Sequence, residues 1–169
     1  MSIGRLRSGE LLAGAGAVVL LGSLFADWFG VDLGAASRLG DVVIGPAHSS
    51  GWDALGWLVL ALAAAAIALA GWLVVATATV RPVTQVVAAD VLTATIGSVA
   101  FVVLALRAVV FQPGPNELVT VKAGAWIGLA GALLLAVGAW WSLADERTDA
   151  PESTYVPPAP RPAPPARAS

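Results

Sequence analysis

Two charged side chains lie within the third long apolar stretch of the sequence. Asp90 and Arg107 both belong to the stretch Val86 to Phe111, which is long enough to cross a lipid bilayer. Ionisable residues inside such a segment are rare and are candidates for proton, ion or substrate handling. Seventeen residues separate the two, which is about 25 Å along a helix, so they cannot pair within one chain. Each must find its own partner.

Arg107 lies about one helical turn below the end of its stretch, and two acids are expected at that same end. Asp27 is near the end of the first apolar segment, and Asp53 is at the start of the second. One hypothesis is that Arg107 pairs with Asp27 or Asp53 and so ties three helices together. The alternative is that its guanidinium reaches the lipid headgroups without a partner. The sequence leaves both open.

Asp90 lies one turn into its stretch, at the other end. It could carry a proton or a cation, but transport sites are more often found near the bilayer midplane. We favour a structural carboxylate at a helix start, where the helix dipole stabilises an anion. Thr95 and Ser98, nearer the middle, are expected to bond the preceding carbonyl groups of their own helix.

No other constellation indicates catalysis or metal binding. His48 is the only histidine and there is no cysteine, which excludes a disulfide, thiolate chemistry and a bis-histidine haem within one chain. Ser49, His48 and Asp41 have no ordered spacing that indicates a catalytic triad. We therefore assign no catalytic residue, no metal ligand and no cofactor, and we expect His48 to lie on the surface of a loop.

The composition indicates a membrane protein. Of the 169 residues 58% are hydrophobic and only 12% are charged, half the share usual in soluble domains, and the mean hydropathy is +0.83. The net charge of −2 argues against nucleic acid as a partner. The apolar residues fall into four blocks, so the predicted fold is an all-α bundle of four transmembrane helices within residues 1–149. The predicted spans are about 11–29, 54–78, 86–111 and 123–144.

Two segments outside the spans are long. Residues 30–53 are predicted to form an ordered loop, with a short strand or turn at Val42-Val43-Ile44. Residues 150–169 contain seven of the eleven prolines and little apolar bulk, which is typical of a disordered tail. PxxP patterns in this tail leave a docking role open as the alternative.

Small residues recur every four positions in the last span. Gly124, Gly128, Ala132 and Ala136 would share one helix face, and such faces let helix backbones approach closely in lipid. We expect this face to pack within the chain; homodimerisation is the alternative. Exposed aromatic residues are expected at both ends of the bundle, as in the aromatic belts of membrane proteins. They are Phe25, Trp28, Phe29, Trp52, Trp57, Phe111 and Trp126 at one end and Trp72, Trp140 and Trp141 at the other.

Basic residues set the expected orientation. Arg5, Arg7, Arg81 and Arg147 flank the spans on one side, and Arg38 and Lys122 flank them on the other. The side richer in arginine is expected to be cytoplasmic, which places both termini inside. Because eight arginines stand against one lysine and alanine, glycine and valine are abundant, we expect a bacterial protein of the inner (cytoplasmic) membrane.

Three sequence patterns carry a resemblance: LFADWFG after the first span, the return GWDALGW, and the closing helix GAWIGLAGALLLAVGAWW. With them the chain is similar to small four-helix membrane proteins of actinobacteria, of unknown function. The resemblance covers Gly9 to about Arg147 and implies the architecture but no activity. We expect a non-enzymatic structural or accessory component that lies in the lipid bilayer and acts through a protein partner. The alternative is a small channel or transporter subunit acting as a homo-oligomer.

Overall fold

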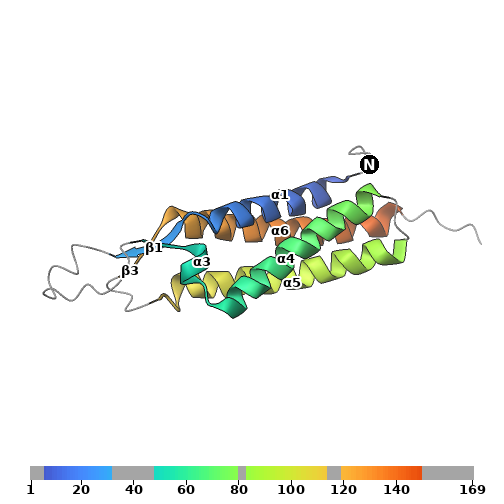
Figure 1. Ribbon diagram of the computed structural model, residues 1–169. Helices are drawn as coiled ribbons and strands as arrows, with labels where there is room; N and C mark the ends of the chain where they lie inside the picture. The colour runs from blue at the N-terminus through green and yellow to red at the C-terminus, as the bar shows by residue number, and fades with distance from the viewer. Residues whose placement is uncertain (1–5, 32–47, 80–82, 114–118, 150–169) are drawn as a thin grey trace, which may run out of the picture.

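The computed structural model describes residues 6–31, 48–79, 83–113 and 119–149, except for the side chains of residues 83–86 and 145–149. The described part is mostly helical. Four long helices, α1 (Ser8–Ser23), α4 (Trp57–Ala78), α5 (Val83–Val109) and α6 (Ala123–Asp149), lie side by side in Figure 1 and alternate in direction. A short helix, α3 (Gly51–Ala54), precedes α4. The predicted tail, 150–169, lies outside the described residues.

Three of these helices are long and apolar enough to cross a membrane, over Trp57–Ala78, Val87–Val109 and Ala123–Ala144. These segments agree closely with the predicted spans 54–78, 86–111 and 123–144. The predicted first span, 11–29, differs from the structure because α1 has only 16 residues and ends at Ser23.

Helix α1 ends early because its last carbonyl groups find partners in a tight turn. The backbone N–H groups of Leu24, Phe25 and Ala26 donate to the carbonyls three residues before them, at 3.0 to 3.2 Å. The Ser23 carbonyl also accepts the indole N–H of Trp28 at 2.7 Å. Partners of this kind satisfy a helix terminus and allow the chain to leave it.

A three-stranded antiparallel sheet follows at the end of the bundle where α1 and α5 finish. Its strands are β1 (Asp27–Val31), β2 (His48–Ser50) and β3 (Val119–Val121), in the order β2-β1-β3. Figure 1 shows the labelled strands beyond the ends of the long helices. The all-α prediction is therefore incomplete, since it did not include this sheet. The predicted strand or turn at Val42-Val43-Ile44 lies outside the described residues.

Strand pairing in the sheet brings together three segments that connect the helices. Gly30 of β1 lies opposite His48 of β2 on one side and Thr120 of β3 on the other. The β1–β2 pairing is irregular between Asp27 and Phe29, which indicates a bulge. Because β1 follows α1, β2 precedes α3 and β3 precedes α6, the sheet links the ends of these helices.

Candidate functional site

Arg107 lies in the last turn of α5. One guanidinium nitrogen donates to the Ala54 carbonyl at 2.9 Å, and another donates to the Phe111 carbonyl. Ala54 ends α3, so the arginine joins the end of α5 to the short helix that leads into α4. The charge is therefore satisfied by backbone carbonyls, which belong to the unpaired acceptors of helix ends.

Neither predicted acid pairs with Arg107 in the structure. Asp27 lies 3.6 Å from the Nδ1 of His48, and Asp53 accepts a hydrogen bond from the Ser50 hydroxyl at 2.7 Å. Both acids are on the exposed side of the sheet and α3. Arg107 instead connects α5 to α3 through the Ala54 carbonyl.

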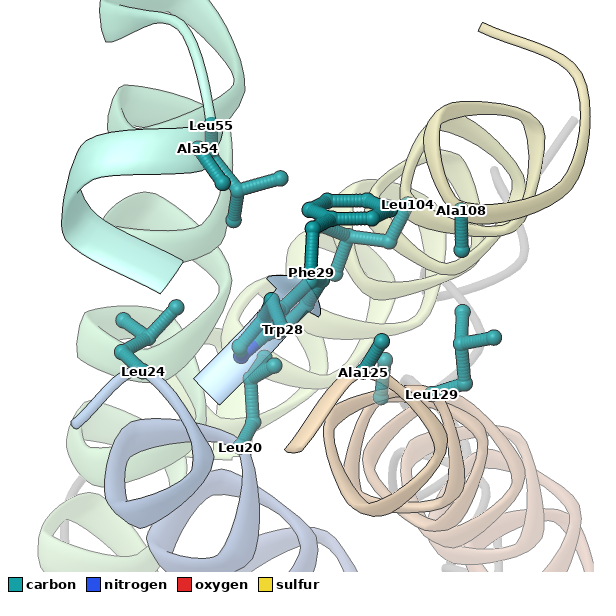
Figure 2. Packing of buried hydrophobic residues seen from close by; sticks show 11 residues of the cluster. Leu20, Leu24, Trp28, Phe29, Ala54, Leu55, Leu104, Ala108, Ala125 and Leu129 are labelled. Carbon is teal, nitrogen blue, oxygen red and sulfur yellow. The ribbon is translucent and has the colours of Figure 1, made fainter. Parts of the chain in front are cut away.

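The junction between sheet and helices is filled by two aromatic residues of β1. Trp28 and Phe29 are 0% and 2% exposed, and Figure 2 shows them at the centre of a cluster of buried side chains. Leu20 and Leu24 come from α1 and the turn after it, and Leu104 comes from α5. The cluster also includes Ala54, Leu55, Ala108, Ala125, Leu129 and Ala132.

We expected Trp28 and Phe29 among the exposed belt residues, and this prediction was wrong for both. Their rings are buried because the chain turns at residues 24–26 and β1 passes over the ends of the helices. A tryptophan whose indole N–H finds a carbonyl partner can be buried completely. Other aromatic residues expected at the bundle ends are exposed: Phe25, Trp52, Trp57, Trp72, Phe111, Trp126, Trp140 and Trp141.

Asp90 is fully buried on α5, at 0% exposure. The register of the helices shows what lies at its level. A Cβ added to Gly97 would lie 2.6 Å from the Leu135 side chain, and α5 and α6 run in opposite directions, so Asp90 lies near the level of Ser142. Ser142 in turn contacts Gly9 of α1, beside Glu10. Glu10 and Ser142 are also buried, so α1, α5 and α6 each place one polar side chain at this level.

Glu10, Thr95 and Ser98 each form a hydrogen bond within their own helix or its cap. Glu10 accepts the Arg7 backbone N–H at 3.0 Å and so caps the start of α1. Thr95 donates to the Val91 carbonyl and Ser98 to the Ala94 carbonyl, at 2.8 and 2.7 Å, which confirms the prediction for these two hydroxyls. Ser98 also accepts the indole N–H of Trp140 at 3.0 Å, which joins α5 to α6.

Helices α1 and α6 pack along a continuous seam of small residues. A Cβ added to Gly16 would lie 2.4 Å from the Leu135 nitrogen, and one added to Gly138 would lie 2.3 Å from the Ala13 nitrogen. The two backbones therefore touch. We define the α1–α6 seam as Gly9, Ala13, Gly16, Leu20 and Ser23 of α1 with Gly128, Gly131, Leu135, Gly138 and Ser142 of α6. Its steps alternate between four and three residues, which is the pattern of an antiparallel coiled pair.

The predicted small-residue face of α6 packs against two different elements. A Cβ added to Gly124 would lie 2.5 Å from the Asp27 carbonyl oxygen, and one added to Gly128 would lie 2.5 Å from the Trp28 ring. Ala132 and Ala136 are buried as well, and Ala136 lies opposite Gly97 of α5. All four residues therefore lie inside the bundle, against β1 at one end and α5 at the other.

The outward face of α4 differs from those of the other helices. Between Leu58 and Trp72 its exposed residues are all alanine or glycine: Ala61, Ala64, Ala65, Ala68 and Gly71. We call these five residues the outward α4 face. The exposed residues of α5 and α6 are instead mostly large, such as Val99, Val102, Leu133 and Val137. Helix α4 is also the least enclosed, with 22% of its most apolar stretch buried, against 39% in α5 and 50% in α6.

His48 lies on the exposed side of β2, as predicted for a loop-surface residue, although it belongs to a strand. In the part of the chain that the structure describes, no three His, Cys, Asp or Glu side chains are grouped as a metal site would require. No family model matches the sequence, and neither a curated protein nor a solved structure matches it.

Proposed function

We propose that the chain crosses a membrane four times and acts there as a non-enzymatic structural or accessory component, through a partner helix on the outward α4 face. The observation that carries this proposal is the small-residue composition of that face. Lipid-facing positions of α5 and α6 are large and branched, whereas small residues on a membrane helix allow a second helix to approach closely.

The α1–α6 seam shows how small residues at this spacing allow two helices to pack. Ala61, Ala64, Ala68 and Gly71 are separated by steps of three, four and three residues, which are the steps of the α1–α6 seam. In that seam the pattern brings two backbones into contact. A Cβ added to Gly71 has no atom within 4 Å, and the other three residues are exposed, so no described part of the chain covers this copy of the pattern.

Four crossings are supported by the packing of α1. It contacts α6 from Gly9 beside Ser142 to Ser23 beside Gly128, a length of about 21 Å. Since α6 is long and apolar enough to span a membrane, a helix that accompanies it over this distance spans most of the hydrocarbon core as well. The charged side chains of Asp27 and His48 would then lie in water beyond the outer end of α1.

The proposed setting is the inner membrane of a bacterium, with both termini in the cytoplasm and the sheet on the outer side. The arginines that flank the helix ends away from the sheet support this orientation. A non-enzymatic role is supported by the described charged and hydroxyl groups, because Arg107, Asp53, Ser98 and Thr95 are engaged in hydrogen bonds that hold the fold.

A homo-oligomeric channel or transporter subunit is the second candidate. The outward α4 face carries no charge, so a second copy could pack against it without electrostatic repulsion. The interior of one bundle is filled by side chains such as Trp28, Leu104 and Leu135. Any path would therefore have to lie between copies.

The test compares two substitutions that both enlarge an exposed side chain. Ala68→Leu obstructs the outward α4 face, and Val137→Leu changes the exposed face of α6. The proposal predicts that proteins co-purifying with the chain from native membranes are lost with Ala68→Leu and retained with Val137→Leu. Equal co-purification with both variants would refute the docking role of α4. A homo-oligomer that conducts ions in liposomes would favour the second candidate.

A further inference from the structure

Among the residues that the structure describes, only uncharged groups hold the guanidinium of Arg107. It donates to the carbonyls of Ala54 and Phe111. Carbonyl oxygens accept these hydrogen bonds but carry no net charge. The described acids at this end of the bundle, Asp27 and Asp53, are engaged with side chains of β2. The positive charge of Arg107 is therefore not balanced by a described carboxylate in direct contact with it.

Three of the five guanidinium N–H groups remain for another acceptor. The two carbonyls use one N–H group on each terminal nitrogen. The hydrogen bond to Ala54 is partly buried, whereas the hydrogen bond to Phe111 is exposed. The group is thus fixed on its buried side and accessible on the other. A planar fork of donors held in this way matches two oxygens of a phosphate group.

Arg107 lies at the depth of lipid headgroups when α5 crosses a membrane. The apolar stretch of α5 ends at Val109, two residues or about 3 Å beyond Arg107. Trp57, at the start of the apolar stretch of α4, and Phe111 are 76% and 62% exposed at the same end of the bundle. Exposed aromatic rings are typical of the boundary between hydrocarbon and headgroups. The anions that surround the protein at this depth are the phosphates of phospholipids.

We propose that Arg107 is a binding site for the phosphate of one phospholipid, in the leaflet on the side of the sheet. Two oxygens of the phosphodiester accept two of the remaining N–H groups and supply the counter-charge. A charged side chain near the end of a membrane helix is costly without such a partner. The inference rests on the proposed membrane setting, but it does not depend on the docking role of the outward α4 face.

Binding of the phosphate should also affect α3, because Arg107 connects the two. The phosphate restricts the guanidinium, which on its other side holds the Ala54 carbonyl at the end of α3. Helix α3 has only four residues, and short elements open locally at low cost. A bound phosphate should therefore slow amide hydrogen exchange in α3. An ion pair that is partly exposed changes such an opening equilibrium by about two- to fivefold.

The experiment is hydrogen–deuterium exchange of the full chain in two kinds of nanodisc with the same acyl chains. One is made of phosphatidylcholine, which carries a phosphate, and the other of a diglucosyl diacylglycerol, which carries none. Both bilayers have no net charge, so the pH at their surfaces is the same. Peptides that cover residues 51–54 report on α3, and peptides that cover β3 are the internal reference. The wild-type protein should exchange about two- to fivefold more slowly in α3 in phosphatidylcholine.

Three variants locate the effect. Arg107→Met should abolish the difference between the two lipids. Lys122→Met is the matched control, because it removes one positive charge at the same end of the bundle and leaves the Arg107 guanidinium in place; it should keep the difference. Ala68→Leu should also keep it, so failure of the α4 docking role and failure of the phosphate site give different results.

Three outcomes would overturn the proposal. The first is equal α3 exchange of the wild type in both lipids, a comparison that needs no variant and holds even where Arg107→Met folds poorly. The second is a difference that persists in Arg107→Met or disappears in Lys122→Met. The third is slower α3 exchange when inorganic phosphate is added in excess to the glycolipid nanodiscs, because the ligand would then be free phosphate and not a lipid.

Discussion

Gly16→Ala is expected to destabilise the bundle although alanine is the better helix former. The new Cβ would lie 2.4 Å from the Leu135 nitrogen, 2.7 Å from the Gly131 oxygen and 2.9 Å from the Leu134 carbonyl carbon. Carbon atoms pack at about 3.5 to 4.0 Å, so α1 and α6 would have to separate by roughly 1 Å. Both obstructing elements are backbone, which cannot move aside as a side chain can.

The magnitude follows from two opposed effects. Overpacking of a tight interface costs about 1 to 3 kcal/mol. Alanine in place of glycine favours a helix by up to about 1 kcal/mol. Gly71→Ala is the matched control, because it makes the same change in the middle of α4 where a Cβ meets no atom within 4 Å. The helix-forming gain is common to both variants, so Gly16→Ala should be less stable than Gly71→Ala by about 1 to 3 kcal/mol.

The assay is reversible unfolding by SDS in mixed micelles, followed by tryptophan fluorescence. The signal comes from seven tryptophans, one of which, Trp28, packs against Gly128 at the end of the seam; the other six remain in a Trp28 variant. If Gly16→Ala proves as stable as Gly71→Ala, the backbone contact between α1 and α6 is not present in the membrane. Gly138→Ala gives a second check: because the same seam must open for both, the double variant should lose less stability than the sum of the single variants.

Two further predictions concern the sheet-capped end. Arg107→Met should destabilise the bundle by about 1 to 3 kcal/mol, because the carbonyls of Ala54 and Phe111 lose charged donors. The rate of amide hydrogen exchange in α3 should rise. An unchanged exchange rate would show that the arginine does not hold this helix. Trp28→Phe should cost about 1 to 3 kcal/mol in the same unfolding assay, since the buried Ser23 carbonyl loses its indole donor. Full stability of Trp28→Phe would contradict the role given to that hydrogen bond.

Much of the helical architecture could be predicted from the sequence, because long apolar blocks are a strong local signal. The span-capable helices α4, α5 and α6 agree with the predicted ranges to within a few residues at most boundaries. The sheet could not be predicted in this way. Two of its strands have three residues each, too few to show the alternation by which strands are identified, and their register depends on contacts between distant segments.

For a similar reason, the hydrogen-bond partners of the charged residues could not be predicted from the nearby sequence. Depth along a helix placed Arg107 near the end of its span but left open whether it pairs with an acid or reaches the lipid headgroups. That the acceptor is the Ala54 carbonyl depends on α3, a four-residue helix with no periodic signal of its own. The same limit applies to α6, where a four-residue period identified Gly124 and Gly128. The α1–α6 seam alternates steps of four and three, and it becomes visible only when both helices are known to be neighbours.

The most direct measurement tests whether α1 crosses the membrane with the other helices. The chain has no cysteine, so single cysteines can be introduced at the exposed residues Ser8, at the start of α1, and Thr120, in β3 of the sheet that follows it. In sealed right-side-out membrane vesicles an impermeant maleimide should label Thr120→Cys at once and Ser8→Cys only after permeabilisation. Labelling of both positions from the same side would show that α1 does not cross and would contradict the four-span bundle.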